Sequence, residues 1–324
     1  MPRPTLLPHE LGDEFTYARA RAAGVSARRL RARDLEAPHR GVRLRLLDDP
    51  AGVDDDPGAA DRRARRALLR RAHAYREIMP AHAFFVGRTA AVIHGIPLHA
   101  GGPLEVAVAA PHRAPRAAGI RSRQVSPSLV FVREVDGLPV ASPASAWAML
   151  GVELSVRELV IIGDAIVAVP RGPGGRRVGM RSLATVDELA RAASQRRRRG
   201  SPRLRRALAL IRVGSSSPLE SELRLDAETA GLPEPELDVE VRDTKGQLLG
   251  ISELVYREFG TIVEVEGDHH RTSRAQWNRD IDKYAAYAAQ GWEVVRLTSR
   301  HIRTEHPRGV AMVRAALVRH GWRP

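Results

Sequence analysis

The sequence of 324 residues contains no cysteine, and aromatic residues make up only 4% of it. The absence of cysteine excludes disulfides, zinc sites built on thiolates and cysteine nucleophiles, and it favours a cytoplasmic protein. No stretch approaches 18 consecutive apolar residues, so the sequence predicts no transmembrane helix. Residues 1–10 lack the apolar core of a signal peptide. We therefore expect a protein of the cytoplasm that does not enter a membrane.

Lysine is almost absent as well, and arginine supplies nearly all of the positive charge. The 52 basic residues outnumber the 38 acidic ones, which gives a net charge of +14. The excess lies wholly in residues 1–214, with a net charge of +17, whereas residues 215–324 carry a net charge of −3. A compositional bias toward arginine explains part of this excess. The remainder indicates a polyanion such as DNA as the partner of the basic part.

Turn-rich stretches at residues 54–58 and 213–217 divide the chain into three predicted domains. For the first two domains the pattern of helices and strands predicts an α+β fold. For the third it predicts an α/β fold in the order helix, three-strand meander, helix, strand, helix. The predicted domains are residues 1–55, 56–212 and 215–324.

The first domain has the pattern of a helix-turn-helix motif followed by the strand of a wing. Thr16 is expected to cap a helix that ends before Gly24, and Ser26 to cap a second helix over residues 27–33. A small helical hairpin that does not bind DNA produces the same pattern. The candidate DNA contacts are the arginines of the second helix and of the wing: Arg28, Arg29, Arg31 and Arg40.

The second domain opens with an arginine-rich segment, residues 59–74, which predicts a helix with a narrow apolar stripe. Arginines at this density fit two roles equally well. They can contact phosphate groups, or they can form a solvated face of the helix. The sequence alone does not decide between these roles.

The third domain contains the stretch Ile262–His270, IVEVEGDHH, which predicts a strand followed by a loop. Because side chains alternate along a strand, Glu264 and Glu266 share one face. Neighbouring carboxylates repel one another unless a proton or a cation lies between them. With a carboxylate from an adjacent strand, such a pair forms the kind of site that holds Mg²⁺. A solvent-exposed strand face shows the same alternation.

Five motifs of the third domain resemble, in their order, an actinobacterial branch of domains of unknown function related to very-short-patch-repair endonucleases. That branch belongs to the restriction-endonuclease-like PD-(D/E)XK superfamily, and the resemblance covers roughly residues 215–305. The motifs are SxLESxxR (217–224), GLPEPE (231–236), EVEGDHH (264–270), RD (279–280) and GWEVVRLT (291–298).

The part of the chain before residue 150 resembles the AbiEi-type antitoxins, which have a winged helix and a follow-on domain. The resemblance lies in four short motifs spread over the first two predicted domains. These motifs are AAGVSxxxL (22–30), HRGV (39–42), AAVIHGI (90–96) and GLPVASPA (137–144).

The resemblance to the endonuclease branch implies hydrolysis of DNA phosphodiester bonds with Mg²⁺ or Mn²⁺ as the cofactor. The metal ligands of the family fall on Glu253 and Glu264, and the helix glutamate that can join them at the metal falls on Glu220. The next acidic position falls on Glu266, and the loop histidine on His270, which would transfer a proton or contact the phosphate. The candidate catalytic residues are thus Glu253, Glu264, Glu266 and His270, and the candidate phosphate contacts of this domain are Arg279 and Lys283.

Two features depart from the pattern of the superfamily. Glu253 stands where the family has an aspartate, and no lysine follows Glu264 by two residues. The alternative function is therefore an antitoxin-like transcriptional repressor whose nuclease fold only binds DNA, with a toxin as candidate partner. Action on RNA is a further alternative, against which the scarcity of aromatic residues for base stacking argues.

Overall fold

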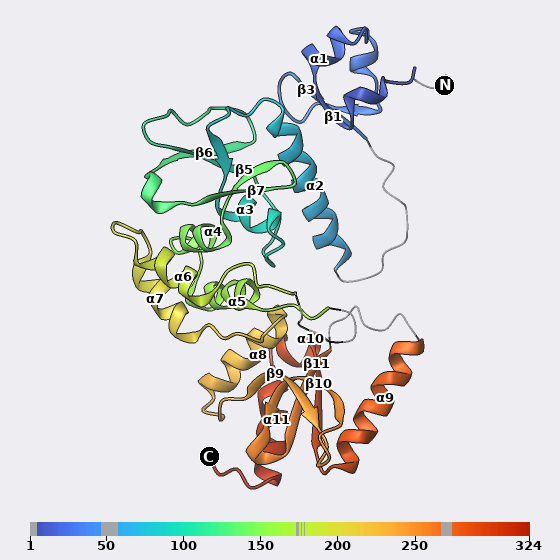
Figure 1. The fold of residues 1–324 in the computed structure, drawn as a ribbon, viewed down its shortest axis with the longest axis vertical. Helices are drawn as coiled ribbons and strands as arrows, with labels where there is room; N and C mark the ends of the chain where they lie inside the picture. Colours follow the sequence, from blue (N-terminus) through green and yellow to red (C-terminus); the bar gives the residue numbers. More distant parts are fainter. Residues whose placement is uncertain (1–4, 47–57, 173–174, 176, 178, 267–273) are drawn as a thin grey trace. The chain divides into compact units, whose positions relative to one another are not determined.

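The computed structural model of the chain describes residues 5–46, 58–172, 175, 177, 179–266 and 274–324. The described residues form eleven α-helices and three β-sheets (Figure 1). None of the described helices combines the length and the apolar character needed to cross a membrane. The chain forms two compact units. The first comprises Met1–Asp55, Ala59–Leu150 and Gln195–Arg198, and the second Asp56–Gly58, Gly151–Ser194 and Arg199–Pro324.

The first unit begins with a three-stranded antiparallel sheet in the order β1-β3-β2. The predicted cap is confirmed: the hydroxyl of Thr16 accepts a hydrogen bond from the N–H of Arg19 at 3.1 Å. The predicted second helix over residues 27–33 is wrong, because only a single 3-10 turn forms there. Leu30 is the one buried side chain of that turn, and one turn with a single apolar anchor does not nucleate a longer helix. The elements are η1 (His9–Leu11), β1 (Glu14–Thr16), α1 (Tyr17–Ala22), η2 (Arg29–Arg31), β2 (Leu35–Glu36) and β3 (Val42–Arg45).

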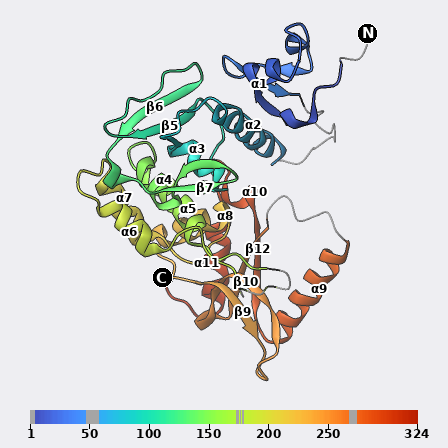
Figure 2. The same cartoon turned by 45° about the horizontal axis from the view of Figure 1, so that its top comes forward.

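The rest of the first unit is a five-stranded sheet in the order β6-β5-β4-β8-β7 with helices beside it. Helix α2 contacts β1 and β3 of the small sheet and also α3, β5 and β8 (Figure 2). Leu68, Ala72 and Tyr75 of α2 pack with Phe85 and Leu104 in the core of this unit. The elements are α2 (Ala59–Arg76), β4 (Ala83–Phe85), α3 (Gly87–Ile93), β5 (Leu104–Ala109), β6 (Ile120–Val125), η3 (Pro127–Leu129), β7 (Val132–Val135), β8 (Leu138–Ala141) and α4 (Pro143–Leu150).

The described part of the second unit begins with four helices that precede the C-terminal sheet in the sequence. Ser155 starts α5 through a capping box with Glu158. Because α5 contacts both α7 and α8, these helices belong to the same compact unit as the C-terminal sheet. This division differs from the boundary predicted at residues 213–217, where the turn-rich sequence does not coincide with a break in the packing. The elements are α5 (Val156–Val167), α6 (Val186–Ser194), α7 (Ser201–Leu210) and α8 (Pro218–Thr229).

The C-terminal sheet has the order β12-β11-β10-β9, with β11 and β12 parallel and the other neighbours antiparallel. Helix α9 covers one face through Tyr287, which packs against Val255 and Ile262. Helices α8 and α11 cover the other face through Leu223 and Leu317. The predicted order of elements is confirmed, with the short helix α10 as an addition. The elements are β9 (Glu236–Arg242), β10 (Leu248–Tyr256), η5 (Arg257–Phe259), β11 (Thr261–Glu266), α9 (Arg274–Ala289), β12 (Glu293–Thr298), α10 (Ser299–Ile302) and α11 (Gly309–Arg319).

Candidate functional site

The regular alternation of β10 is broken at Glu253, at the centre of the C-terminal sheet. Leu254 packs in the core beneath α8 and α11. The hydroxyl of Ser252, two residues earlier, instead contacts Glu264 and the hydroxyl of Tyr287 on the face covered by α9. In a regular strand, residues two apart share a face. The antiparallel pairing of β10 with β11 accordingly ends at Leu254, and the chain is locally distorted at Glu253.

This distortion directs the carboxylate of Glu253 toward the main chain of β11, where it accepts the N–H of Val265. Burial and the negative charges of Glu220 and Glu264 raise the pKa of Glu253 to about 9. The N–H of Val265 and the ammonium of Lys283 act in the opposite direction but do not offset them. Glu253 therefore keeps a proton at neutral pH unless a cation takes the place of that proton.

Groups from β10 and α9 contact the carboxylate of Glu264, and only 8% of its side chain is exposed. The Nζ atom of Lys283 lies 2.7 Å from Oε1 of Glu264 and 2.7 Å from the carbonyl oxygen of Ile251. Ser252 donates its hydroxyl to the same oxygen of Glu264 at 2.8 Å. The hydroxyl of Tyr287 lies 2.9 Å from Oγ of Ser252, so these groups form a connected chain that fixes the carboxylate.

Glu220 reaches this region from the first turn of α8 and is buried, with 4% of its surface exposed. Ser217 caps the helix by accepting the N–H of Glu220, and the N–H of Ser216 donates to the carboxylate at 2.9 Å. Burial raises the pKa of Glu220, and the charge of Asp238 on β9 raises it further. Asp238 has a positive φ of 51°, and its carboxylate is paired with Arg171. Asp238 is thus a fourth carboxylate in this region, beside Glu220, Glu253 and Glu264, and the sequence did not indicate it.

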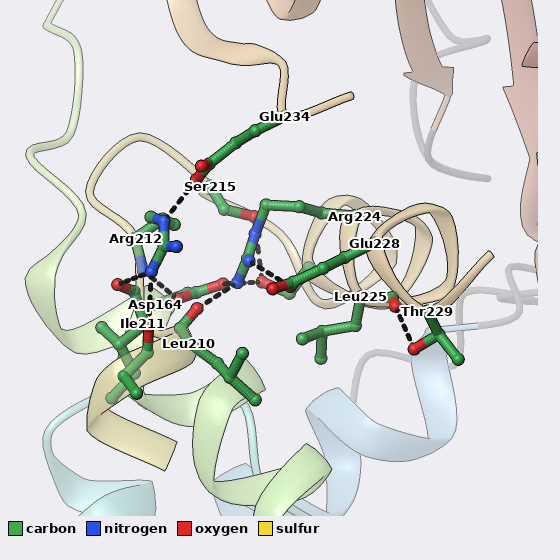
Figure 3. A network of polar contacts seen from close by, with 12 residues as sticks. Asp164, Leu210, Ile211, Arg212, Ser215, Arg224, Leu225, Glu228, Thr229 and Glu234 are labelled. Carbon is green, nitrogen blue, oxygen red and sulfur yellow. Dashed lines mark hydrogen bonds and ion pairs between the residues drawn. The ribbon is translucent and has the colours of Figure 1, made fainter. Parts of the chain in front are cut away.

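A buried polar network fixes the first turns of α8 against α5 (Figure 3). Asp164 of α5 is fully buried, and its Oδ2 atom lies 2.8 Å from both Oγ of Ser221 and Nη2 of Arg224. Its Oδ1 atom accepts the N–H of Arg212 at 2.8 Å. Burial raises the pKa of Asp164, and the charge of Arg224 lowers it. Because Ser221 directly follows Glu220, this network also positions Glu220.

Two other predicted residues of the third domain, Glu266 and Arg279, lie in different surroundings. The carboxylate of Glu266 is paired with Arg296 of β12, which draws it toward the neighbouring strand. Arg279 is exposed on α9. His270 lies outside the described residues.

The candidate DNA contacts of the first domain differ in their surroundings. The guanidinium of Arg29 donates to both carboxylate oxygens of Asp34, at 2.9 and 2.6 Å, and to the carbonyl of Thr5. Arg29 therefore stabilises the turn and is not presented to solvent. The exposed members of the predicted set are Arg28, Arg31 and Arg40.

The residues that sequence reasoning missed at the site are Ser252 and Tyr287, together with Asp238. Nothing in a single strand or helix marks them, because the contacts join residues 12 and 35 positions apart in the chain. The sequence did give one signal for Lys283, which contacts Glu264 beside these residues. Lys283 is one of only two lysines in a chain that uses arginine almost everywhere else. A lysine there provides a compact ammonium that the planar guanidinium of arginine does not replace.

The sequence matches no family model and no curated protein. Among the residues that the structure describes, no group of three or more His, Cys, Asp or Glu side chains is arranged to hold a metal ion. Glu253 and Glu264 nevertheless fit Mg²⁺ in their donor chemistry. This ion takes one or two carboxylates and completes its shell with water and with oxygens of the substrate. The proton held by Glu253 marks a place where a cation relieves the repulsion between the carboxylates.

Proposed function

We propose that the second unit hydrolyses phosphodiester bonds of DNA with Mg²⁺ or Mn²⁺ as its cofactor. The supporting observation is that Glu220, Glu253 and Glu264 lie close together. Burial and the charges of Glu220 and Glu264 raise the pKa of Glu253 to about 9. When bound, the cation supplies a Lewis acid for the phosphate and lowers the pKa of a bound water. Glu253 and Glu264 are the residues that would hold it.

The other side chains of the site position these carboxylates and receive the substrate. Ser252 and Tyr287 hold the carboxylate of Glu264 in one orientation by their hydrogen bonds. Lys283, with Nζ 2.7 Å from Glu264, donates to a phosphate oxygen that approaches the same carboxylate. The place of this lysine on α9 gives the site the positive charge that the sequence lacks two residues after Glu264.

A plasmid assay tests this proposal with isosteric variants. The purified full chain is incubated with supercoiled plasmid and Mn²⁺, beside Glu264→Gln and Glu253→Gln. The matched control is Glu240→Gln, because Glu240 lies on β9 of the same sheet, where it pairs with Arg242. We expect both site variants to lose about a hundredfold or more in rate and the control to retain it. Equal rates for all four proteins at every metal concentration would reject the hydrolase.

A transcriptional repressor without hydrolytic activity is the second candidate function. The observation that favours it is the ammonium of Lys283, which already occupies the position of a cation beside Glu264. Under this alternative a toxin would be the protein partner, as for the antitoxins that the first unit resembles. Calorimetric titration with Mn²⁺ separates the two functions. A repressor shows no heat of binding to Mn²⁺, and its specific binding to an operator survives both EDTA and Glu264→Gln.

A further inference from the structure

Two arginines of the segment between α5 and α6 share one carboxylate of β9. The Nε atom of Arg171 lies 2.5 Å from Oδ1 of Asp238, and the Nη2 atom of Arg177 donates to Oδ2 of the same residue. Arg171 also lies 3.6 Å from Glu240, but that carboxylate pairs with Arg242 at 2.7 Å. Three guanidinium groups thus face two carboxylates, so this group of side chains carries an excess of one positive charge.

The two arginines differ in how many of their donors the chain uses. Besides the carboxylate, Arg171 donates to the carbonyl oxygens of Asp238 and Gly175, at 2.9 and 2.8 Å, and only 16% of its side chain is exposed. Arg171 therefore holds the segment on β9. Among the described residues, Arg177 donates only to Asp238, through Nη2, and its side chain is 41% exposed. Because a guanidinium has five N–H donors, most donors of Arg177 can reach a ligand from solvent.

This arginine pair lies beside the glutamates of the candidate site. A Cβ atom added to Gly175 would lie 2.4 Å from Cδ1 of Ile251, so the segment packs directly on β10. The carbonyl of Ile251 accepts the same ammonium that pairs with Glu264. Asp238 is near enough to Glu220 for its charge to contribute to the raised pKa of that glutamate. Phosphates follow one another every ~3.4 Å along the axis of a DNA strand, so a strand at the glutamates brings a second phosphate toward the arginine pair.

We propose that Arg177 binds a backbone phosphate of DNA beside the glutamates, and that Asp238 holds its guanidinium in place until DNA binds. The choice of DNA as the ligand rests on the proposed function, since it takes the strand to lie along the glutamates. Carboxylates and phosphates accept the N–H groups of a guanidinium in the same way, so the phosphate can replace Asp238 as the partner of Arg177. Asp238 then keeps its ion pair with Arg171, and no carboxylate loses its counter-charge.

The backbone of Asp238 permits a conservative substitution. Its φ of 51° is in the left-handed region, which asparagine adopts as readily as aspartate. Asp238→Asn therefore removes the charge and keeps the main chain, while Arg177→Gln removes the exposed guanidinium. The matched controls are Arg319→Gln and Glu293→Gln. These two residues form an ion pair between α11 and β12, at the opposite edge of the sheet from β9.

Fluorescence anisotropy measures how the full chain binds a short labelled DNA duplex over a range of NaCl concentrations in EDTA, which prevents hydrolysis. Arg177→Gln should weaken binding about tenfold and lower the slope of log affinity against log salt by about 0.9, the contribution of one phosphate. Asp238→Asn should instead strengthen binding about threefold, because the phosphate no longer competes with a carboxylate. This gain should vanish when Asp238→Asn is combined with Arg177→Gln, since Asp238 acts through that arginine. Both controls should change the affinity less than about twofold.

Three results would overturn the proposal, with circular dichroism verifying that each variant is folded. Weaker binding by both Arg177→Gln and Asp238→Asn would show that the ion pair only supports the fold. A gain from Asp238→Asn that persists without Arg177 would assign the effect to another cation. A loss in Arg319→Gln as large as that in Arg177→Gln would show that net charge alone matters. The proposed function fails separately, because binding in EDTA needs no hydrolysis: an inactive chain in the plasmid assay leaves the phosphate contact intact.

Discussion

Raising the pH is expected to destabilise the chain through Glu253 when no divalent cation is bound. The pKa of this carboxyl is about 9 in the folded chain, against an ordinary value of 4.5. The folded state therefore keeps a proton that the unfolded chain releases, so the associated stability is complete below about pH 4.5 and is lost as the pH rises toward 9. One pKa unit corresponds to about 1.4 kcal/mol, which sets an upper limit of about 3 kcal/mol for the loss between pH 5 and pH 7. Such a loss is a substantial part of the 5–15 kcal/mol typical of a folded protein.

Urea unfolding in EDTA at several pH values measures this loss for the wild type and for Glu253→Gln. The glutamine cannot titrate, so the free energy of unfolding of the variant should fall less with pH over the same range. Glu220 and Asp164 also have raised pKa values and are present in both proteins, so the difference between the two curves reports Glu253 together with its coupling to Glu220. Saturating Mn²⁺ at pH 8 should recover part of the stability of the wild type only. Parallel curves for the two proteins would refute the electrostatic argument for the site.

Three substitutions test the packing around the site. Asp164→Asn should cost about 3 kcal/mol of unfolding free energy, because it removes the buried counter-charge of Arg224 at 2.8 Å and leaves the more distant and more exposed Glu228 at 3.8 Å. Lys283→Met should cost about 2 kcal/mol, since it removes the ammonium that pairs with the mostly buried Glu264. The cost is smaller than for Asp164→Asn because the side chain of Lys283 is 20% exposed, so the pair is not completely buried. Gly250→Ala should cost about 1–3 kcal/mol, because the added Cβ would lie 2.5 Å from the hydroxyl of the buried tyrosine of α9.

Urea denaturation measures the free energy of unfolding of all three variants. An exposed ion pair in the second unit supplies a control for Asp164→Asn. Arg157 of α5 and Asp226 of α8 form an ion pair at 2.6 Å between the same two helices, but in an exposed position. Arg157→Ala should therefore cost less than about 1 kcal/mol. If the exposed and the buried pair prove equally costly, burial is not the cause. If Gly250→Ala unfolds like the wild type, α9 lies farther from β10 than described.

The helices and strands with local signals could be predicted from the sequence. Thr16 caps the helix that follows it, and the C-terminal unit shows the predicted order of helices and strands. The short strands β4 and β8 were missed, because their sequences do not alternate and their pairing with each other joins segments more than 50 residues apart, although each also pairs with a strand closer in the sequence. The second helix of the first domain was overestimated, since caps and charge indicated it but only one buried residue supports it.

The candidate site could be predicted only in part, and for a similar reason. Glu220, Glu253 and Glu264 lie within reach of one another's charges, and their roles as ligands stay a prediction. Glu266 has the expected place on β11, but its partner Arg296 comes from a parallel strand whose register the sequence does not reveal. The contact of Ser252 with Glu264 depends on the break in strand alternation, and no sequence pattern indicated it.

The ion pair between α5 and α8 determines where the C-terminal part of the chain can be cut for laboratory use. Arg224 donates to Asp164 and to the carbonyl of Leu210, both of which precede residue 215. A fragment that starts in the turn-rich segment at residues 213–217 would contain Arg224 but lack Asp164 and Leu210, which accept its hydrogen bonds. A fragment for expression of the second unit by itself should therefore start near Gly151, so that it includes helices α5 to α7 together with the sheet.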